Sequence, residues 1–139
     1  MKIVSSLALC LALVLVLTTA TVAADAVTRT VNAPEDRVWA VAEAVLKHQG
    51  WEIEKADRAI GWITTKSRML EGGDYGVYAK GVRHQLRVHV KGAGPKTSVS
   101  VERTVFNRER ILWMDKDEPV TVKDKAVEET LLDDIGKSI

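Results

Sequence analysis

Residues 33–65 constrain the fold most, because they join a helical pattern, a glycine stop and two strand patterns. Apolar residues between positions 38 and 46 recur at three- and four-residue spacings, which places them on one helical face. Pro34 suits the first turn of this helix, and Gly50 suits the left-handed residue that ends it. Alternation from position 51 and a β-branched, aromatic run ending at position 65 predict two strands joined by a turn. The stretch therefore predicts an amphipathic helix and a hairpin, the nucleus of an α+β domain.

A second hairpin is predicted from residues 82–106. Its two halves alternate apolar with polar side chains, and a turn containing glycine and proline separates them. If Val90 lies opposite Val99, Arg87 falls opposite Glu102, which is a favourable cross-strand pair. The match of charges favours this register.

Loops are predicted at residues 67–81 and 115–118. The first carries four glycines and no sustained period, with the alternative that residues 75–79 begin the following strand, and the second is polar. Residues 107–110 interrupt the alternation of the preceding strand. A strand at residues 27–31 precedes the first helix, and a helix with an apolar face reaching Ile135 closes the chain.

Thr121, with Asp124 three residues later, resembles a capping box for the closing helix. The predicted order is β-α-β-β-β-β-α. We expect an α+β fold in which an antiparallel sheet of four to five strands carries both helices on one face. The other face of the sheet is left to water or a partner.

The N-terminus has the composition of an export signal. A positive start at Met1-Lys2 precedes an apolar run over residues 3–20, and small residues follow. This predicts a signal peptide over residues 1–24 and a single α+β domain over residues 25–139, periplasmic or secreted, with no integral membrane span. The alternative is an uncleaved membrane anchor, because the apolar run approaches spanning length.

Cys10, the only cysteine, lies inside the leader and lacks the small preceding residue that lipid attachment requires. The mature chain would therefore contain no thiol. Without Lys2 it holds 19 basic and 19 acidic residues, and this balance argues against nucleic-acid binding.

The pattern APEDRVWAVAEAVLKHQGWEIEKADRAIGWITT, with Val-Trp in its first helical turn and a DRxxG turn, resembles the repeated domains of BamC (NlpB-type) envelope proteins. The closing VEETLLDDI is similar to the last helix of such domains. The resemblance covers nearly the whole predicted mature chain. It implies a helix-grip domain with an accessory, non-catalytic role beside outer-membrane assembly machinery. BamC-type proteins carry a lipid anchor and two such domains after an extended segment, whereas this sequence predicts a single domain and no lipid signal.

No residue pattern points to catalysis or to a cofactor. His48, His84 and His89 lack the spacing of a zinc site, and a nucleophile elbow is missing from the sequence. We therefore predict a non-catalytic protein with no metal. The motivation for the alternative, a hydrolase, is the glycine-bearing stretch 67–81 and the loop carboxylates. These carboxylates are Asp57, Asp74, Asp115 and Asp117.

The candidate binding surface is the polar face of the second hairpin. Its residues are Arg83, Arg87, His89, Lys91 and Glu102. A flat face with several cations would suit an unknown envelope protein or an anionic envelope component. The alternative is an ordinary solvated sheet face. Of Trp39, Trp62 and Trp113, at least one is expected to be exposed, which favours an interface.

Three functions remain open at this point. A protein-interaction module of the cell envelope is preferred, because the family resemblance implies it and the sequence shows no chemistry. A small-ligand or lipid-binding domain is the alternative, since helix-grip sheets in other families enclose an apolar cavity. A hydrolase ranks third.

Overall fold

The computed structural model describes residues 26–139, and the side chains at positions 71 and 74 are left aside. The predicted signal peptide, residues 1–24, lies outside this range. The helices are α1 (Glu35–His48) and α2 (Ala126–Lys137). The strands are β1 (Val27–Val31), β2 (Ile53–Asp57), β3 (Trp62–Thr65), β4 (Arg68–Asp74), β5 (Tyr78–Ala93), β6 (Lys96–Ile111) and β7 (Met114–Val120).

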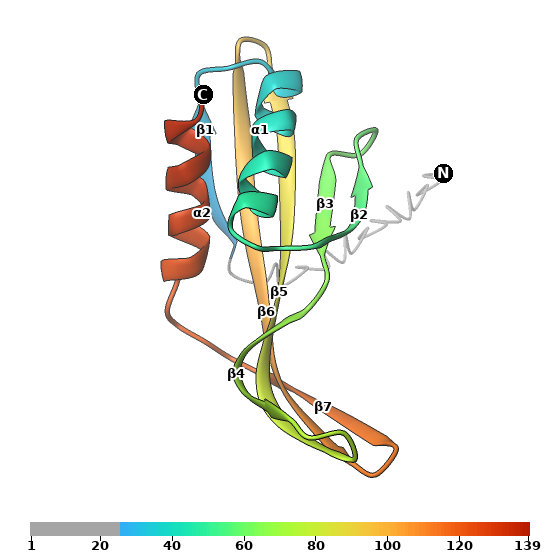
Figure 1. The fold of residues 1–139 in the computed structure, drawn as a ribbon. Helices are drawn as coiled ribbons and strands as arrows, with labels where there is room; N and C mark the ends of the chain where they lie inside the picture. The colour runs from blue at the N-terminus through green and yellow to red at the C-terminus, as the bar shows by residue number, and fades with distance from the viewer. Residues whose placement is uncertain (1–25) are drawn as a thin grey trace, which may run out of the picture.

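One antiparallel sheet, in the order β1-β6-β5-β3-β2, forms the centre of the described structure, with β4 added beside β5 and β7 beside β6. The two central strands are 16 residues long and form an unbroken hairpin. Their upper halves lie under the two helices, and their lower halves extend beyond the helices (Figure 1). We call the helix-covered part the body. We call β4, β7 and the lower halves of β5 and β6 the arm.

The core lies between the two helices and one face of the body sheet. Every second residue in the body parts of β5 and β6, from Leu86 to Val90 and from Val99 to Val101, points into it. The apolar faces of α1 and α2 point into it from the other side. The fully buried members include Leu46, Ile63, Leu86, Val88, Val99, Val101, Leu131 and Ile135. Side chains of this size fill the space between helices and sheet, so the body is held together by apolar burial. The prediction that both helices share one face is confirmed.

The ends of α1 follow the expected chemistry. Glu35 and Asp36 lie in the first turn, where negative charge complements the helix dipole. His48 is the last helical residue, and Gly50 follows with a φ of 86°. This left-handed turn redirects the chain, so that Trp51 is buried against the core.

The predicted register of the second hairpin is confirmed. Val90 pairs with Val99, and Arg87 pairs with Glu102. An ion pair of 3.9 Å joins the Arg87 guanidinium and the Glu102 carboxylate.

The strand count was wrong, because the described residues form seven strands in place of the four to five expected. Most of the predicted loop at 67–81 is β4 and the start of β5. A bulge between Met69 and Glu71 breaks the alternation of β4. Gly72, with a φ of 109°, lies so close to β5 that an added Cβ would be 2.2 Å from the Lys80 carbonyl oxygen.

The second predicted loop is also strand, since residues 115–118 lie within β7. Residues 107–110, where the sequence pattern is interrupted, continue β6. All seven residues of β7 are exposed, so no buried face gives the strand an apolar alternation. Its pairing with β6 is the physical reason that this polar segment is extended.

The predicted capping box at the start of α2 was also wrong. The helix begins at Ala126, and no side chain caps it from Lys125. The Asp124 carboxylate instead accepts a hydrogen bond from the Ala126 N–H at 2.8 Å. Thr121 lies outside the cap, in the segment that returns from the arm.

Candidate functional site

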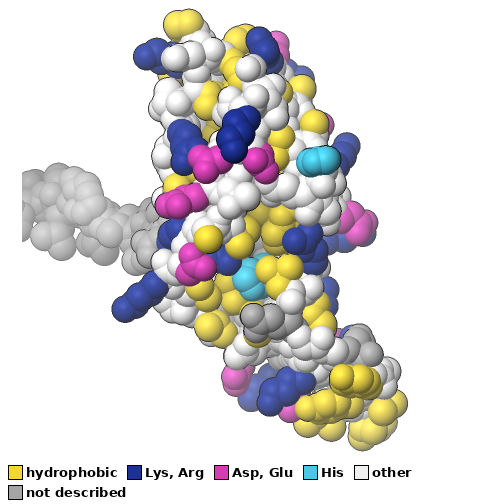
Figure 2. All heavy atoms as spheres, turned by 60° about the vertical axis from the view of Figure 1, so that its left-hand side comes forward, with side chains coloured by type: hydrophobic (Ala, Val, Ile, Leu, Met, Phe, Trp, Pro, Cys, Tyr) yellow, Lys and Arg dark blue, Asp and Glu magenta, His cyan; other side chains and the backbone are white. Residues whose placement is uncertain are grey.

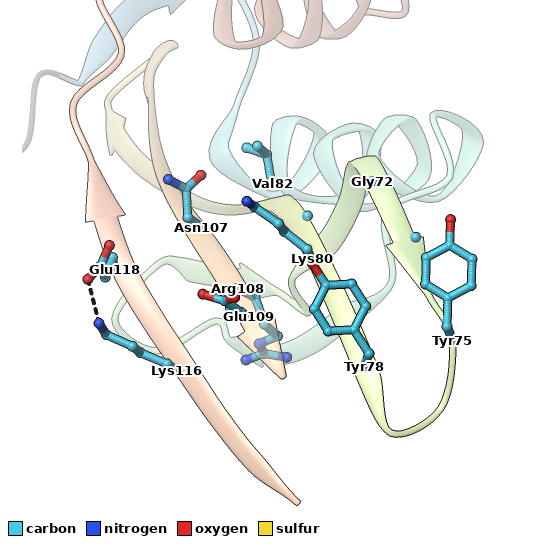
Figure 3. A pocket seen from close by; sticks show the side chains of 12 residues that line it. Gly72, Tyr75, Tyr78, Lys80, Val82, Asn107, Arg108, Glu109, Lys116 and Glu118 are labelled. Carbon is cyan, nitrogen blue, oxygen red and sulfur yellow. Dashed lines mark ion pairs between the residues drawn. The ribbon is translucent and has the colours of Figure 1, made fainter. Parts of the chain in front are cut away.

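A groove of about 700 Å³ lies on the arm, on the sheet face that carries the helices in the body. Figure 3 shows the lining residues, which come from all four strands of the arm; β4 contributes two glycines. The lining residues are Gly72, Gly73, Tyr75, Tyr78, Lys80, Gly81, Val82, Asn107, Arg108, Glu109, Lys116 and Glu118. Such a site can hold an extended segment or a small polar group, but it does not enclose a ligand.

A row of alternating charges crosses the groove. The register places Lys80 opposite Glu109, and Glu109 opposite Lys116. An ion pair of 3.0 Å joins the Lys116 ammonium to the Glu118 carboxylate (Figure 3). The hydrogen bond from Lys116 to Glu118 raises the pKa of the lysine, so it is a cation at neutral pH. The groove therefore presents both signs of charge to an occupant.

Two tyrosines form the wall of the groove near the end of the arm. The rings of Tyr75 and Tyr78 are stacked at a centroid distance of 6.5 Å. The Tyr75 ring lies over Gly73, where an added Cβ would be 2.8 Å from it. Glycines at this point leave backbone exposed, which permits close approach of another chain.

Charge pairs also join β6 to β7, from residues that alternate along these strands with Glu109 and Lys116. Arg108 donates two hydrogen bonds to Asp117, at 2.7 and 2.9 Å, and Arg110 donates one to Asp115 at 2.7 Å. The hydrogen bonds from Arg108 hold the pKa of the Asp117 carboxyl below its ordinary value. These aspartates, predicted in a loop, are thus strand residues engaged by arginines.

The end of the arm is apolar. The β4–β5 and β6–β7 turns lie beside each other there, and Figure 2 shows their apolar side chains gathered at the lower end of the molecule. We call this cluster the tip. Its members are Tyr75, Val77, Tyr78, Ile111, Leu112, Trp113 and Met114, with exposed fractions from 43% to 85%. The apolar run 111–114 between two polar segments was the one signal of it in the sequence.

The predicted partner face lies on the open side of the sheet, but it is only partly one cluster. His89 stacks on Trp62 at 4.4 Å, and the Arg87 guanidinium lies 4.4 Å from the same ring. Glu102 joins this group through Arg87. Arg83 turns away and donates to the Ser67 hydroxyl and carbonyl at 3.1 and 3.0 Å. Lys91 is exposed near the far end of β5.

The tryptophans divide between core and surface. Trp39 is buried in α1, Trp62 is half-buried on the open face, and Trp113 is 85% exposed at the tip. The expectation of an exposed tryptophan is confirmed.

The three histidines lie apart from one another and have different neighbours. His48 is exposed at the end of α1, and His84 Nδ1 lies 3.3 Å from a guanidinium nitrogen of Arg103. Within residues 26–139, no group of three or more His, Cys, Asp or Glu side chains is arranged to hold a metal ion. Asp57 accepts a hydrogen bond from the Ala59 N–H at 3.1 Å, as in an ordinary turn.

Comparison with known proteins finds no matching family model and no similar curated protein. Neither of the two described helices is long and apolar enough to cross a bilayer.

Proposed function

We propose that this chain is an exported, non-catalytic interaction module of the bacterial cell envelope, and that the groove of the arm is its binding surface for another protein. The observation that carries the proposal is the groove itself. It lies on four strands that extend beyond the helix-covered body, and its floor of glycines and wall of tyrosines face solvent. The likeness to BamC-type domains supports an accessory role beside outer-membrane assembly machinery.

The chemistry of the groove fits an extended polypeptide. Tyrosines supply large contact areas at low entropic cost, and exposed backbone permits close approach. The row Lys80–Glu109–Lys116 would select a partner by charge pattern, because misplaced like charges are costly at an interface.

The packing of the body favours this function over enclosure of a small ligand. Leu86, Val88 and Ile63 are fully buried beneath the helices, where a helix-grip cavity would otherwise lie. A small ligand or lipid would instead occupy an open surface hollow such as the groove of the arm. A hydrolase is disfavoured by the engagement of Asp115 and Asp117 with arginines.

The open face is a second candidate surface for a protein or an anionic envelope component. Arg87, His89 and Trp62 form a contiguous cationic and aromatic group there. Cation–π contact already engages Arg87, which leaves the groove as the stronger proposal.

The test is photocrosslinking in intact cells from three positions. A photoreactive residue at Asn107 samples the groove, one at Arg87 samples the open face, and one at Arg37 samples the exposed side of α1 as a control. We expect the Asn107 probe to capture one defined envelope protein. Lys80→Glu should abolish capture, whereas the matched change Lys96→Glu, in the exposed turn of the body, should not.

Two results would contradict the proposal. Equal capture from Asn107 and Arg37 would mean that the groove is not selective. A small molecule bound in one-to-one ratio in native mass spectrometry, lost with Lys80→Glu, would assign the groove to ligand binding.

A further inference from the structure

The tip is a second surface of the arm, separate in chemistry from the groove. Its seven exposed apolar side chains are contiguous, whereas scattered single apolar residues are the norm on a monomer. We propose that the tip inserts shallowly into the interfacial region of a phospholipid bilayer.

The shape of the tip favours a bilayer over a protein pocket. The tip is the projecting end of the arm, and its apolar side chains gather at the lower end of the molecule (Figure 2). Trp113 and Met114 are the most exposed of its members on the β6–β7 turn, at 85% and 70%. Tryptophan and tyrosine rings prefer the boundary between water and hydrocarbon, because one part of the ring system is apolar and another is polar.

The backbone of the tip suits a site with little water. The Tyr75 N–H donates to the Tyr78 carbonyl at 2.7 Å, and Ile111 pairs with Met114 across the other turn. Closed turns of this kind carry fewer unsatisfied polar groups into the bilayer surface.

Leu112 gives a second, independent observation. It has a φ of 58° in the two-residue β6–β7 turn, where hairpins favour glycine, asparagine or aspartate. A leucine with 54% of its surface exposed stabilises neither the turn nor the core. An apolar side chain held at such a position indicates that the side chain itself has a use.

The charges behind the tip indicate which membranes it can bind. Arg108 is paired with Asp117, Arg110 with Asp115, and these pairs leave no excess of positive charge beside the tip. Binding should therefore come from apolar insertion, with little dependence on anionic lipid or on salt.

The tip lies far from the start of the described chain. Val27, the first residue of β1, pairs with Val101 on β6. From that level β6 extends ten more residues to Ile111, or about 33 Å. An arm of this length can bring the tip to a surface while the helices of the body stay clear of it.

The test measures quenching of tryptophan fluorescence in the exported protein by brominated phosphatidylcholine vesicles. The four tryptophans all lie within the described residues, so the leader does not contribute to the signal. Comparison with Trp113→Phe isolates the emission of Trp113. We expect about half of that emission to be quenched, and about 0.5 M salt to change the affinity less than twofold.

Leu112→Asp should weaken vesicle binding at least about tenfold, because a carboxylate is expensive at the bilayer surface. Aspartate accepts the left-handed backbone of this turn, so the fold is retained. Ile60→Asp is the matched control, since Ile60 is 61% exposed in the β2–β3 turn of the body, and it should leave binding unchanged. Met114→Asp repeats the test at a second tip position.

Absence of quenching would overturn the proposal, and so would equal effects of Leu112→Asp and Ile60→Asp. A dimer in sedimentation that is abolished by Leu112→Asp, without vesicle binding, would assign the tip to a second copy of the chain. Tyr75 and Tyr78 belong to both the groove and the tip, but the groove is tested by capture from Asn107 and by Lys80→Glu, and the tip by vesicle binding and Leu112→Asp. Either proposal can therefore fail alone.

Discussion

Removal of Arg103 should cost the protein much of its stability, because it leaves a buried carboxylate without its partner. Glu128 lies in the first turn of α2 with 0% of its side chain exposed, and Arg103 on β6 is 5% exposed. Arg103 Nε lies 2.6 Å from Glu128 Oε1, and Lys125 Nζ lies 3.8 Å from Oε2. Neither oxygen accepts a well-aligned hydrogen bond from the described residues, so charge is the main compensation.

The size of the effect follows from the burial. Loss of one partner of a buried ion pair costs about 3–5 kcal/mol of unfolding free energy. We expect Arg103→Met to fall at the lower end, about 3 kcal/mol, because Lys125 keeps part of the compensation. With a urea m-value of about 1.5 kcal/mol/M, the unfolding midpoint should fall by about 2 M.

A double-mutant cycle tests the reasoning. Arg103→Met and Glu128→Met should each lower the unfolding free energy strongly. The double variant should lose about 3 kcal/mol less than the sum of the two single losses. Arg110→Met is the matched control, since the Arg110 and Asp115 side chains are 30% and 47% exposed, and it should cost less than about 1 kcal/mol. Strictly additive losses at Arg103 and Glu128 would refute the argument.

Two further outcomes are expected in the arm. Gly72→Ala should destabilise β4 by about 2 kcal/mol or more in amide exchange, because its Cβ would clash with the Lys80 carbonyl. Gly76→Ala should cost about 1 kcal/mol, because Gly76 also has a positive φ, of 81°, but its added Cβ would meet no atom within 4 Å. Equal losses would remove the clash as the cause. Because Arg108 lowers the pKa of Asp117, ionised Asp117 stabilises the arm above the unfolded pKa of about 4, and this stabilisation is lost as pH falls through the folded pKa. In the wild type, the stability of β7 measured by amide exchange should therefore fall as the pH is lowered. Asp117→Asn should reduce this fall, by less than about 1 kcal/mol because the carboxylate is 44% exposed. The same pH dependence in Asp117→Asn and wild type would contradict the role given to Asp117.

The body could be predicted from the sequence because burial determines its pattern. The alternation that ends at Val90 records which side chains face the helices, and that pattern also fixed the pairing of Arg87 with Glu102. The helix α1 was recognisable for the same reason, since Val38 and Leu46 belong to one buried face.

The arm could not be predicted, because neither of its edge strands carries a buried face. β7 is exposed along its whole length, and its charged sequence is typical of a loop. In β4 a bulge shifts the period, and Gly72 and Gly73 have no side chain to show an alternation. Their extended form depends on strands β5 and β6, which supply the hydrogen bonds from a distance in the sequence.

The candidate site was missed for a related reason. Lys80, Glu109 and Lys116 come from three strands, and their common face follows only from the register. Of the predicted partner face, Arg87, His89 and Glu102 share the open face, whereas Arg83 donates hydrogen bonds to Ser67. Which of these surfaces binds a partner stays a prediction.

Two arginines, Arg68 half-buried and Arg103 buried, hold the arm relative to the body. On the α1 side, Arg68 donates to the Gln49 carbonyl at 2.9 Å and stacks 4.3 Å from the ring of Trp51. On the α2 side, Arg103 pairs with Glu128. Both arginines lie on the helix-bearing face, at the level of the sheet where the helices end. Because β5 and β6 pass unbroken through this level, a tilt of the arm would have to break one of these contacts. The stability that Arg103→Met removes is therefore also the stability that orients the groove and the tip.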